Sequence, residues 1–246
     1  MSLLINFETI DSSGKKEQSA RLVAALRERG YSVGHLVFPD RPRNGAEPDG
    51  LTQLSTGRLI SAYFAGQLKL IEERDSLFRN PPLYDLDKAD KVYIASVIEE
   101  KVFQVLQSVN RREAVFREGG LLDLLAGCDI VVVERLLSAR AYGVAWGVSR
   151  VEIDALEGDL PKPDLSVLLD VDPALAHTSG LRASYNEKWP EIRRLYDLMV
   201  REDLKEGGPE QHVSHWLEVD AAQPEEQIRD QILAAVLRLL PTPAAG

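Results

Sequence analysis

The residues with the clearest chemical potential lie near the N-terminus, in the stretch FETIDSSGKKEQ at residues 7–18. This stretch follows an apolar run with the length of a buried strand and leads into a segment with the apolar spacing of a helix. A strand, a turn of small residues, Gly-Lys and a helix form the layout of a phosphate-binding loop. The match to G-x-x-x-x-G-K-[ST] is incomplete, because Thr9 replaces the first glycine and Lys16 replaces the hydroxyl that binds Mg²⁺. These residues alone leave two interpretations open: a phosphate-binding loop, or an ordinary Ser-Ser-Gly turn before a helix.

The elements that must position this loop alternate between strands and helices. Apolar runs rich in β-branched residues predict five strands, at about residues 3–7, 31–38, 129–134, 164–170 and 215–219. Helical spacing predicts helices at about residues 15–29, 51–70, 90–117, 120–127, 140–156, 184–204 and 224–240. This alternation predicts an α/β fold, a five-stranded parallel sheet flanked by helices on both faces, in a single domain over residues 1–246.

One of these predicted helices, at residues 90–117, has a pronounced apolar face. Its apolar residues fall at spacings of three and four, which places them along one side of a helix. They are Ile94, Ile98, Val102, Val105, Leu106 and Val109. We expect this side either to cover the sheet or to pack against a second copy of the chain, and the sequence leaves both open.

The composition excludes several classes of function. The net charge of -10 over 246 residues disfavours nucleic-acid binding, although it leaves room for a local basic pocket. Cys128 is the only cysteine, which rules out an internal disulfide and a cysteine zinc site. No apolar run approaches the roughly 18 residues of a membrane span, and no signal sequence precedes the first strand. We therefore expect a soluble, cytoplasmic protein without a membrane partner.

Candidate ligand contacts follow from the predicted sheet, because ligands bind at the carboxyl ends of parallel strands. The positions after the strands are residues 11–16, residues 39–41, Glu134 with Arg135, and the segment after Asp170. Taken together and in this order, the motifs at these positions resemble those of the thymidylate kinase family, P-loop nucleoside monophosphate kinases that phosphorylate dTMP. The resemblance covers about residues 3 to 240 and implies a P-loop NTPase fold with a lid segment at about residues 174–190.

Five motifs in sequence carry this resemblance. The stretch at residues 7–18 keeps the frame of the family's F-E-G-x-D-G-x-G-K-[ST]-T-Q. FPDR at residues 38–41 matches F-P-[DE]-R, and SVNRRE at residues 108–113 is close to S-A-N-R-x-E. ERL at residues 134–136 is similar to D-R-Y, and Ser138 and Tyr142 follow it with one residue fewer than in the family. LPKPDL at residues 160–165 and DVDP at residues 170–173 match L-P-K-P-D-L and D-x-D-P.

On the donor side, the resemblance implies ATP as the phosphoryl donor and Mg²⁺ as the metal ion. Lys15 is expected to neutralise the β- and γ-phosphates. The expected loop contacts with the donor are Ser12, Ser13, Gly14, Lys15 and Lys16. Asp11 is similar to the family's carboxylate near the acceptor sugar. Glu134 replaces an aspartate that lies close to the metal, and its extra methylene lets it either reach Mg²⁺, directly or through water, or crowd the site.

On the acceptor side, the resemblance implies that arginines bind a nucleoside monophosphate, because a guanidinium holds a phosphate dianion bidentately. The expected substrate contacts are Phe38, Arg41, Gln107, Arg111, Arg135, Ser138 and Tyr142. Gln107 stands where the family has an aromatic residue that stacks on thymine, which leaves the base preference open. Arg182 is the lid cation expected to close on the transferring phosphoryl group.

The sequence thus predicts a thymidylate kinase-like enzyme that moves the γ-phosphoryl group of ATP to dTMP or a related deoxynucleoside monophosphate. The predicted catalytic residues are Lys15, Asp11, Arg111, Arg135 and Arg182. The altered loop supports an alternative, a nucleotide-binding relative that has lost phosphotransfer and acts as a sensor or partner subunit. Each residue also has a purely structural alternative, such as a salt-bridged arginine or a core tyrosine. The resemblance further implies a homodimer.

Overall fold

A five-stranded parallel sheet forms the centre of the protein. The computed structural model describes residues 2–10, 14–39, 56–57, 60, 69–70, 97–98, 100–174, 183–203 and 215–240. The sheet has the strand order β2-β5-β1-β6-β7, and all of its neighbouring strands pair in parallel. Its strands are β1 (Leu3–Glu8), β2 (Val33–Val37), β5 (Ile130–Glu134), β6 (Leu165–Asp170) and β7 (His215–Asp220). The predicted five-stranded parallel sheet is confirmed, and its arrangement is that of the P-loop NTPase fold.

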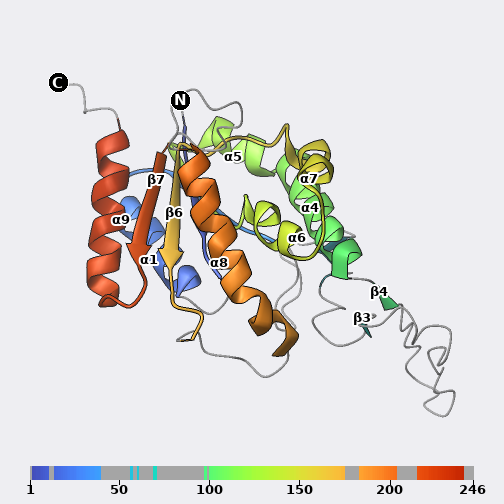
Figure 1. Ribbon diagram of the computed structural model, residues 1–246. Coiled ribbons are helices and arrows are strands. Elements are labelled where there is room, and N and C mark those ends of the chain that lie inside the picture. The colour runs from blue at the N-terminus through green and yellow to red at the C-terminus, as the bar shows by residue number, and fades with distance from the viewer. Residues whose placement is uncertain are drawn as a thin grey trace, which may run out of the picture.

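Helices cover both faces of this sheet (Figure 1). On one face lie α1 (Lys15–Glu28) and α9 (Glu225–Leu239), and the other face carries α4 (Glu100–Phe116), α5 (Leu121–Gly127) and α8 (Ala183–Asp203). Side chains alternate along β1, so that Ile5 and Phe7 pack with Leu22 of α1, whereas Leu4 joins the core on the opposite face. Each face of the central strand is therefore buried, as its unbroken apolar run requires.

The region predicted as one helix over residues 140–156 is broken. It contains the 3₁₀ turn η1 (Ser138–Arg140), α6 (Tyr142–Ala145) and α7 (Arg150–Glu157). Gly147 has a φ of 86°, a left-handed conformation that ends the helical path. Ser149 then starts α7 with a capping box, in which its side chain accepts the Glu152 N–H and the Glu152 carboxylate accepts the Ser149 N–H. The sequence S-x-x-E carried this signal, and the single-helix prediction was wrong.

Two other predicted helices are wrong at their ends. Lys69–Leu70 forms β3 and Val97–Ile98 forms β4, and these short strands pair with each other in parallel. The predicted helix 51–70 therefore does not reach residue 70. Within the predicted helix 90–117, residues 97 and 98 lie in a strand and residues 100–116 are helical. β-Branched residues favour a strand when a partner strand is within reach, and this pairing overrides the helical spacing.

Helix α4 buries a side that the apolar pattern did not predict. Phe103, Ser108, Asn110 and Arg111 are buried. By contrast, Val102 and Val109, which belong to the predicted apolar face, are 51% and 38% exposed. The helix thus turns polar residues inward, next to the carboxyl end of the sheet, and leaves part of its apolar side uncovered.

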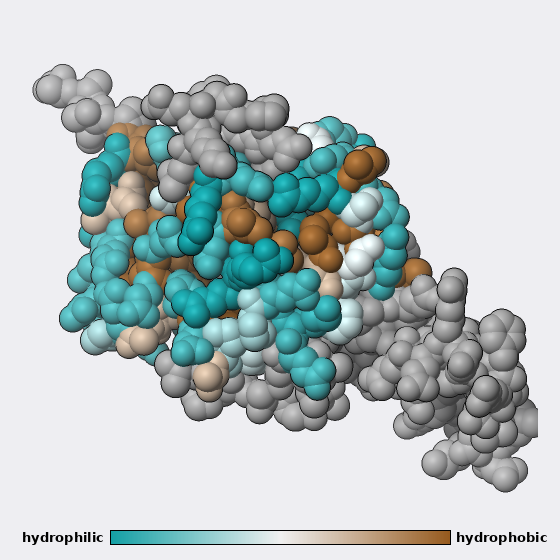
Figure 2. Space-filling model, viewed as in Figure 1, coloured by the Kyte–Doolittle hydropathy of each residue, from teal (hydrophilic) through white to brown (hydrophobic). Residues whose placement is uncertain are grey.

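No helix among the residues that the structure describes is both long enough and apolar enough to cross a membrane. On the face shown in Figure 2, hydrophilic residues cover much of the surface. Apolar residues gather there in small separate patches.

Candidate functional site

The described part of the phosphate loop joins β1 to α1. Gly14 precedes the helix with a φ of 77°, and its carbonyl accepts the Gln18 N–H at 3.0 Å, the first turn of α1. A left-handed residue at this point favours glycine, because a Cβ strains the backbone there. Lys15 and Lys16 occupy the first turn of the helix, where the unpaired N–H groups make a positive end. Asp11, Ser12 and Ser13 lie outside the described residues.

Lys15 is held against the end of the neighbouring strand. Its Nζ lies 2.9 Å from Oε2 of Glu134, the last residue of β5. The side chain of Lys15 is 12% exposed and that of Glu134 is 1% exposed, so this is a largely buried ion pair. The other oxygen, Oε1, accepts the Ser19 hydroxyl at 2.6 Å, and His35 Nε2 lies 3.5 Å from it. Lys15 thus lies at the carboxyl edge of the sheet, and its role in phosphate binding stays a prediction.

The surroundings of Glu134 favour its negatively charged form, because they lower the pKa of its carboxyl group. Burial raises the pKa of the carboxyl group, but the contacts with His35, Lys15 and Ser19 outweigh burial and hold it far below its usual 4.5. Glu134 is therefore an anion that already has its counter-ion. A second anion next to Lys15, such as a phosphate, has to compete with this carboxylate for the lysine.

The donor site fits a directly bound Mg²⁺ poorly among the described residues. Both carboxylate oxygens of Glu134 are engaged by Lys15 and Ser19, and the side chain is buried. Lys16, which occupies the position of the metal-binding hydroxyl, is exposed and has no lone pair to offer when charged. No group of three or more His, Cys, Asp or Glu able to hold a metal occurs in the described ranges. The geometry favours Glu134 as the counter-ion of Lys15, and its role as a metal ligand stays a prediction.

Thr9, which replaces the family's first loop glycine, is accommodated by a hydrogen bond. Its hydroxyl donates to the Leu169 carbonyl on β6 at 2.7 Å, and the residue is 1% exposed. The side chain therefore satisfies a carbonyl group of the adjacent strand. The loss of glycine at this point does not disrupt the end of β1.

Arg135 follows β5 in an unusual backbone conformation. Its φ is 66°, which makes it the one non-glycine residue with a positive φ in the described part of the chain. Its N–H donates to the Phe7 carbonyl at 2.9 Å, and its guanidinium carbon lies 5.0 Å from the centre of the Tyr142 ring. The Tyr142 hydroxyl in turn donates to the Thr9 carbonyl at 3.4 Å. A guanidinium stacked on an aromatic ring is held in place by that contact, and guanidinium groups are suited to binding anions.

Arg111 is buried in an ion pair. Its Nε and Nη2 lie 2.7 Å and 2.6 Å from Oε1 of Glu157, and both side chains are at most 4% exposed. Nη1 and Nη2 also donate to the hydroxyls of Ser138 and Ser108, each at 3.1 Å. The Ser138 hydroxyl donates to the Arg135 carbonyl at 3.1 Å. Arg111 therefore connects α4, α7 and the turn that carries Arg135.

The remaining predicted contacts are more scattered. Phe38 is 1% exposed and belongs to the apolar core that contains Leu4, which fits a structural role. Gln107 donates to the Gln104 side chain at 3.2 Å on α4. Arg41 and Arg182 lie outside the described residues. The structure thus connects Arg111, Ser138, Arg135 and Tyr142 through successive contacts. The contacts given for Gln107 and Phe38 are with Gln104 and with the apolar core, respectively.

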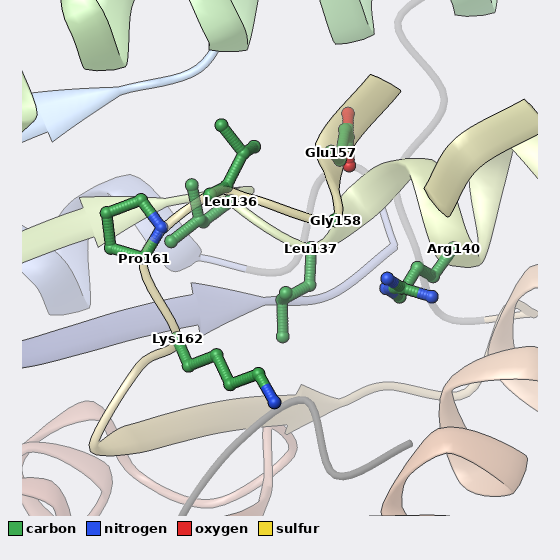
Figure 3. A pocket seen from close by; sticks show the side chains of 8 residues that line it. Leu136, Leu137, Arg140, Glu157, Gly158, Pro161 and Lys162 are labelled. Carbon is green, nitrogen blue, oxygen red and sulfur yellow. The ribbon is translucent and has the colours of Figure 1, made fainter. Parts of the chain in front are cut away.

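A small hollow of about 30 Å³ lies beside the turn that carries Arg135. It is lined by Leu136, Leu137, Arg140, Glu157, Gly158, Leu160, Pro161 and Lys162. Figure 3 shows Arg140 and Lys162 approaching it from two separate segments of the chain. Arg140 is paired with Asp154 at 2.8 Å, and Glu157 is the partner of Arg111. The hollow therefore borders the cluster of predicted acceptor residues.

Sequence reasoning missed several polar residues that organise this edge. Asn6 and Glu8 on β1 are fully buried, and Glu157 neutralises Arg111. Arg193 of α8 makes a bidentate contact with Asp170 at the end of β6, with both distances 2.6 Å. A polar residue inside an apolar strand run was the available signal for Asn6 and Glu8. No local sequence signal pairs Glu157 with Arg111, because the two are 46 residues apart.

The parallel sheet and the Gly-Lys turn at the end of β1 define a P-loop NTPase fold. No family model matches the chain. A probable thymidylate kinase of Archaeoglobus fulgidus is 28% identical over 232 residues, 94% of this chain and 92% of that protein. A thymidylate kinase of Dinoroseobacter shibae is 25% identical over 238 residues, which are 94% of each chain. A thymidylate kinase of Caenorhabditis elegans is 25% identical over 178 residues, which are 72% of this chain and 67% of that protein. These similarities over most of the chain support the thymidylate kinase family.

Proposed function

We propose that this protein is a thymidylate kinase-like phosphotransferase, which moves the γ-phosphoryl group of ATP to dTMP or a related deoxynucleoside monophosphate. The observation that carries the proposal is the meeting of two cationic groups at one edge of the sheet. Lys15 lies at the end of β5 against Glu134, and the next residue in the chain, Arg135, is stacked on Tyr142. The relatives named thymidylate kinase support the same chemistry.

On the donor side, the N–H groups at the start of α1 and the ammonium group of Lys15 would bind the triphosphate of ATP. Lys15 would exchange its contact with Glu134 for contacts with the β- and γ-phosphates. Mg²⁺ would be expected with the donor nucleotide as in the family. The described residues do not fit a directly bound Mg²⁺ ion, so in the proposed reaction the side chains of the protein supply the positive charge.

On the acceptor side, Arg135 would hold the phosphate of the monophosphate in line with the donor. An oxygen of that phosphate attacks the γ-phosphorus, the bond to the β–γ bridging oxygen breaks, and ADP leaves with the electron pair. The protein contributes position and positive charge rather than a covalent intermediate. Arg111 contributes through Ser138, because its guanidinium is occupied by Glu157.

A second function is favoured by a specific observation, the buried pair of Lys15 and Glu134 next to Lys16. A lysine held by a carboxylate and a loop without the metal-binding hydroxyl suit a nucleotide-binding protein that has lost phosphotransfer. Such a protein would act as a sensor or partner subunit. It would bind nucleotides at the same edge of the sheet without turning them over.

Incubation with ATP, MgCl₂ and a panel of deoxynucleoside monophosphates separates the two functions. If the protein is a kinase, one member of the panel gives ADP and a diphosphate in equal amounts, and Lys15→Ala lowers the rate by about 100-fold or more. The control substitution Arg238→Ala, at an exposed arginine in the last turn of α9, leaves the rate within about twofold. Binding of ATP without turnover of any acceptor favours the second function. Absence of both binding and turnover contradicts both.

A further inference from the structure

Two polar side chains on β1 have no place in the chemistry proposed above. Asn6 and Glu8 are each 0% exposed, in a strand whose other residues are apolar. Burying an amide or a carboxylate costs free energy unless hydrogen bonds replace those with water. Side chains two apart on a strand share a face, so both point away from α1 and toward the side that carries α8.

The partners of these side chains are backbone groups of the turn after β5. Oε1 of Glu8 accepts the Leu137 N–H at 2.7 Å, and Oδ1 of Asn6 accepts the Leu136 N–H at 3.2 Å. Oε2 of Glu8 accepts the hydroxyl of Tyr196 from α8 at 2.7 Å. Nδ2 of Asn6 donates to Oε1 of Glu8, at 3.1 Å, and so joins the two acceptors into one network.

The turn at residues 135–137 depends on these hydrogen bonds from β1. Its first residue, Arg135, has a φ of 66°, and a left-handed conformation costs a residue with a Cβ about 1–2 kcal/mol. Three successive N–H groups of the turn donate to β1. The N–H of Arg135 donates to the Phe7 carbonyl, that of Leu136 to Oδ1 of Asn6, and that of Leu137 to Oε1 of Glu8. The strand before the phosphate loop thus fixes the backbone that presents the arginine.

We propose that Glu8, together with Asn6 and Tyr196, is a positioning residue that holds residues 135–137 in the conformation that places the Arg135 guanidinium over Tyr142. The role in acceptor binding rests on the proposed function of Arg135. Glu8 itself touches no substrate: it is fully buried and acts through the Leu137 N–H.

A pair of substitutions at Glu8 tests this role. Glu8→Gln keeps an oxygen for the Leu137 N–H and for Asn6, and its amide can donate to the Tyr196 oxygen. Glu8→Leu removes the acceptor at similar size. Ser166→Ala is the matched control, because Ser166 accepts a hydrogen bond from Nδ2 of Asn6 at 3.1 Å, whereas the N–H groups of residues 135–137 donate to Phe7, Asn6 and Glu8. Tyr196→Phe, which removes one donor to Glu8, provides a milder variant where Glu8→Leu fails to fold.

Two measurements report on these variants: hydrogen exchange of residues 134–142, compared with residues 225–239 of α9, and the KM values for the acceptor and for ATP. We expect Glu8→Leu to speed exchange at residues 134–142 about tenfold or more, with α9 unchanged, and to raise the acceptor KM by a similar factor at constant ATP KM. Tyr196→Phe should show a smaller change in the same direction. Glu8→Gln and Ser166→Ala should stay within about threefold of the wild type.

The proposal is overturned if Tyr196→Phe and any folded Glu8→Leu leave exchange at residues 134–142 unchanged, or if exchange rises equally in α9. It is also overturned if Glu8→Gln is as defective as Glu8→Leu, because the lost feature is then not the acceptor for Leu137. A wild-type protein without turnover removes the proposed function. In that case selective exchange in the variants still supports the positioning of the turn.

Discussion

At the scale of single residues, Glu134 decides the electrostatics of the phosphate loop. It is buried, it ends β5, and it pairs with Lys15, the residue on which the proposed donor site depends. Lys16 stands where the family has a metal-binding hydroxyl, and next to it this carboxylate holds Lys15 in position. The same contact makes Glu134 sensitive to pH in a predictable direction.

The stability supplied by Glu134 should disappear in acid. Burial raises the pKa of this group, but contacts with His35, Lys15 and Ser19 hold it well below the usual 4.5. Since the pKa is lower in the folded protein than in the unfolded chain, the stabilisation is present above about pH 4.5 and is lost as the pH falls below it. The difference in unfolding free energy between the wild type and Glu134→Gln should therefore be constant near neutral pH and narrow below about pH 4.5.

Urea denaturation at a series of pH values measures this difference. The comparison with Glu134→Gln is needed because exposed carboxylates, such as Glu152 with a pKa of about 2, lose their stabilisation over the same range. A difference that stays constant down to pH 3 would show that the Glu134–Lys15 contact does not depress the pKa of Glu134.

Lys16 should reduce the dependence of nucleotide binding on metal. It stands in the first turn of α1, at the position of the family's metal-binding hydroxyl, and is exposed. A lysine is unfavourable at the positive end of a helix unless an anion is bound there. We expect the affinity for ATP, measured by calorimetry, to change less than about threefold between EDTA and MgCl₂. In Lys16→Thr the affinity in EDTA should fall about tenfold and recover with MgCl₂.

The control for this prediction is Arg238→Thr, which removes a positive charge at an exposed position in the last turn of α9. It should leave the affinity unchanged with and without metal. If Mg²⁺ strengthens binding to the wild type as much as to Lys16→Thr, Lys16 does not take over any part of the metal's charge.

At the scale of secondary-structure elements, a buried ion pair fastens α4 to α7. Arg111 and Glu157 are at most 4% exposed, so removing one partner leaves the other charge buried without compensation. Glu157→Ala is expected to lower the unfolding free energy by about 3–5 kcal/mol. Replacing both residues by leucine should recover much of that loss, because a buried pair contributes little net stability compared with apolar packing.

An exposed Arg–Glu pair gives the matched control. Arg150 and Glu202 also connect two helices, with side chains 47% and 37% exposed. Glu202→Ala should lower the unfolding free energy by less than about 1 kcal/mol. If urea denaturation shows that Glu157→Ala and Glu202→Ala lower the unfolding free energy equally, the Arg111–Glu157 pair does not stabilise the packing of α4 against α7.

The elements that the sequence predicted well are those whose pattern is local. The five strands follow from apolar runs, and α1, α8 and α9 follow from helical spacing, because each pattern lies within one segment. The helical spacing predicted one helix in place of α6 and α7, although Gly147 and the Ser149–Glu152 capping box indicate a break between them. β3 and β4 were not predictable, since a two-residue strand depends on a partner far away in the sequence.

For the candidate site too, the sequence predicted what local motifs indicate and missed contacts between distant segments. Lys15, Arg135 and Tyr142 could be placed at the carboxyl edge of the sheet from motif order alone, because that edge collects the ends of parallel strands. The partners of these residues could not. Glu157 beside Arg111, and Tyr196 beside Glu8, come from distant helices, and no single-sequence pattern records such contacts.

At the scale of the whole molecule, α4 leaves an apolar stripe uncovered. Val102, Val109 and Phe116 follow one another at intervals of seven residues, which places them along one side of the helix. They are 51%, 38% and 46% exposed, and the inward side of α4 is occupied by polar residues such as Asn110. Apolar residues gathered along one helix in this way mark an association surface more often than isolated ones do.

We expect this stripe to form the core of a homodimer, in which α4 packs against α4 of a second copy. Val109→Glu, at the middle of the stripe, places a charge in that contact and should shift the protein from dimer to monomer in light scattering coupled to size exclusion. Val151→Glu is the control, because Val151 is 78% exposed on α7 and lies outside the stripe. A wild-type protein that is monomeric at about 100 µM, or a dimer that Val109→Glu leaves intact, contradicts this assignment. Because the polar side of the same helix carries Arg111, separation of the subunits should also weaken acceptor binding, and the acceptor KM of the monomeric variant measures that coupling.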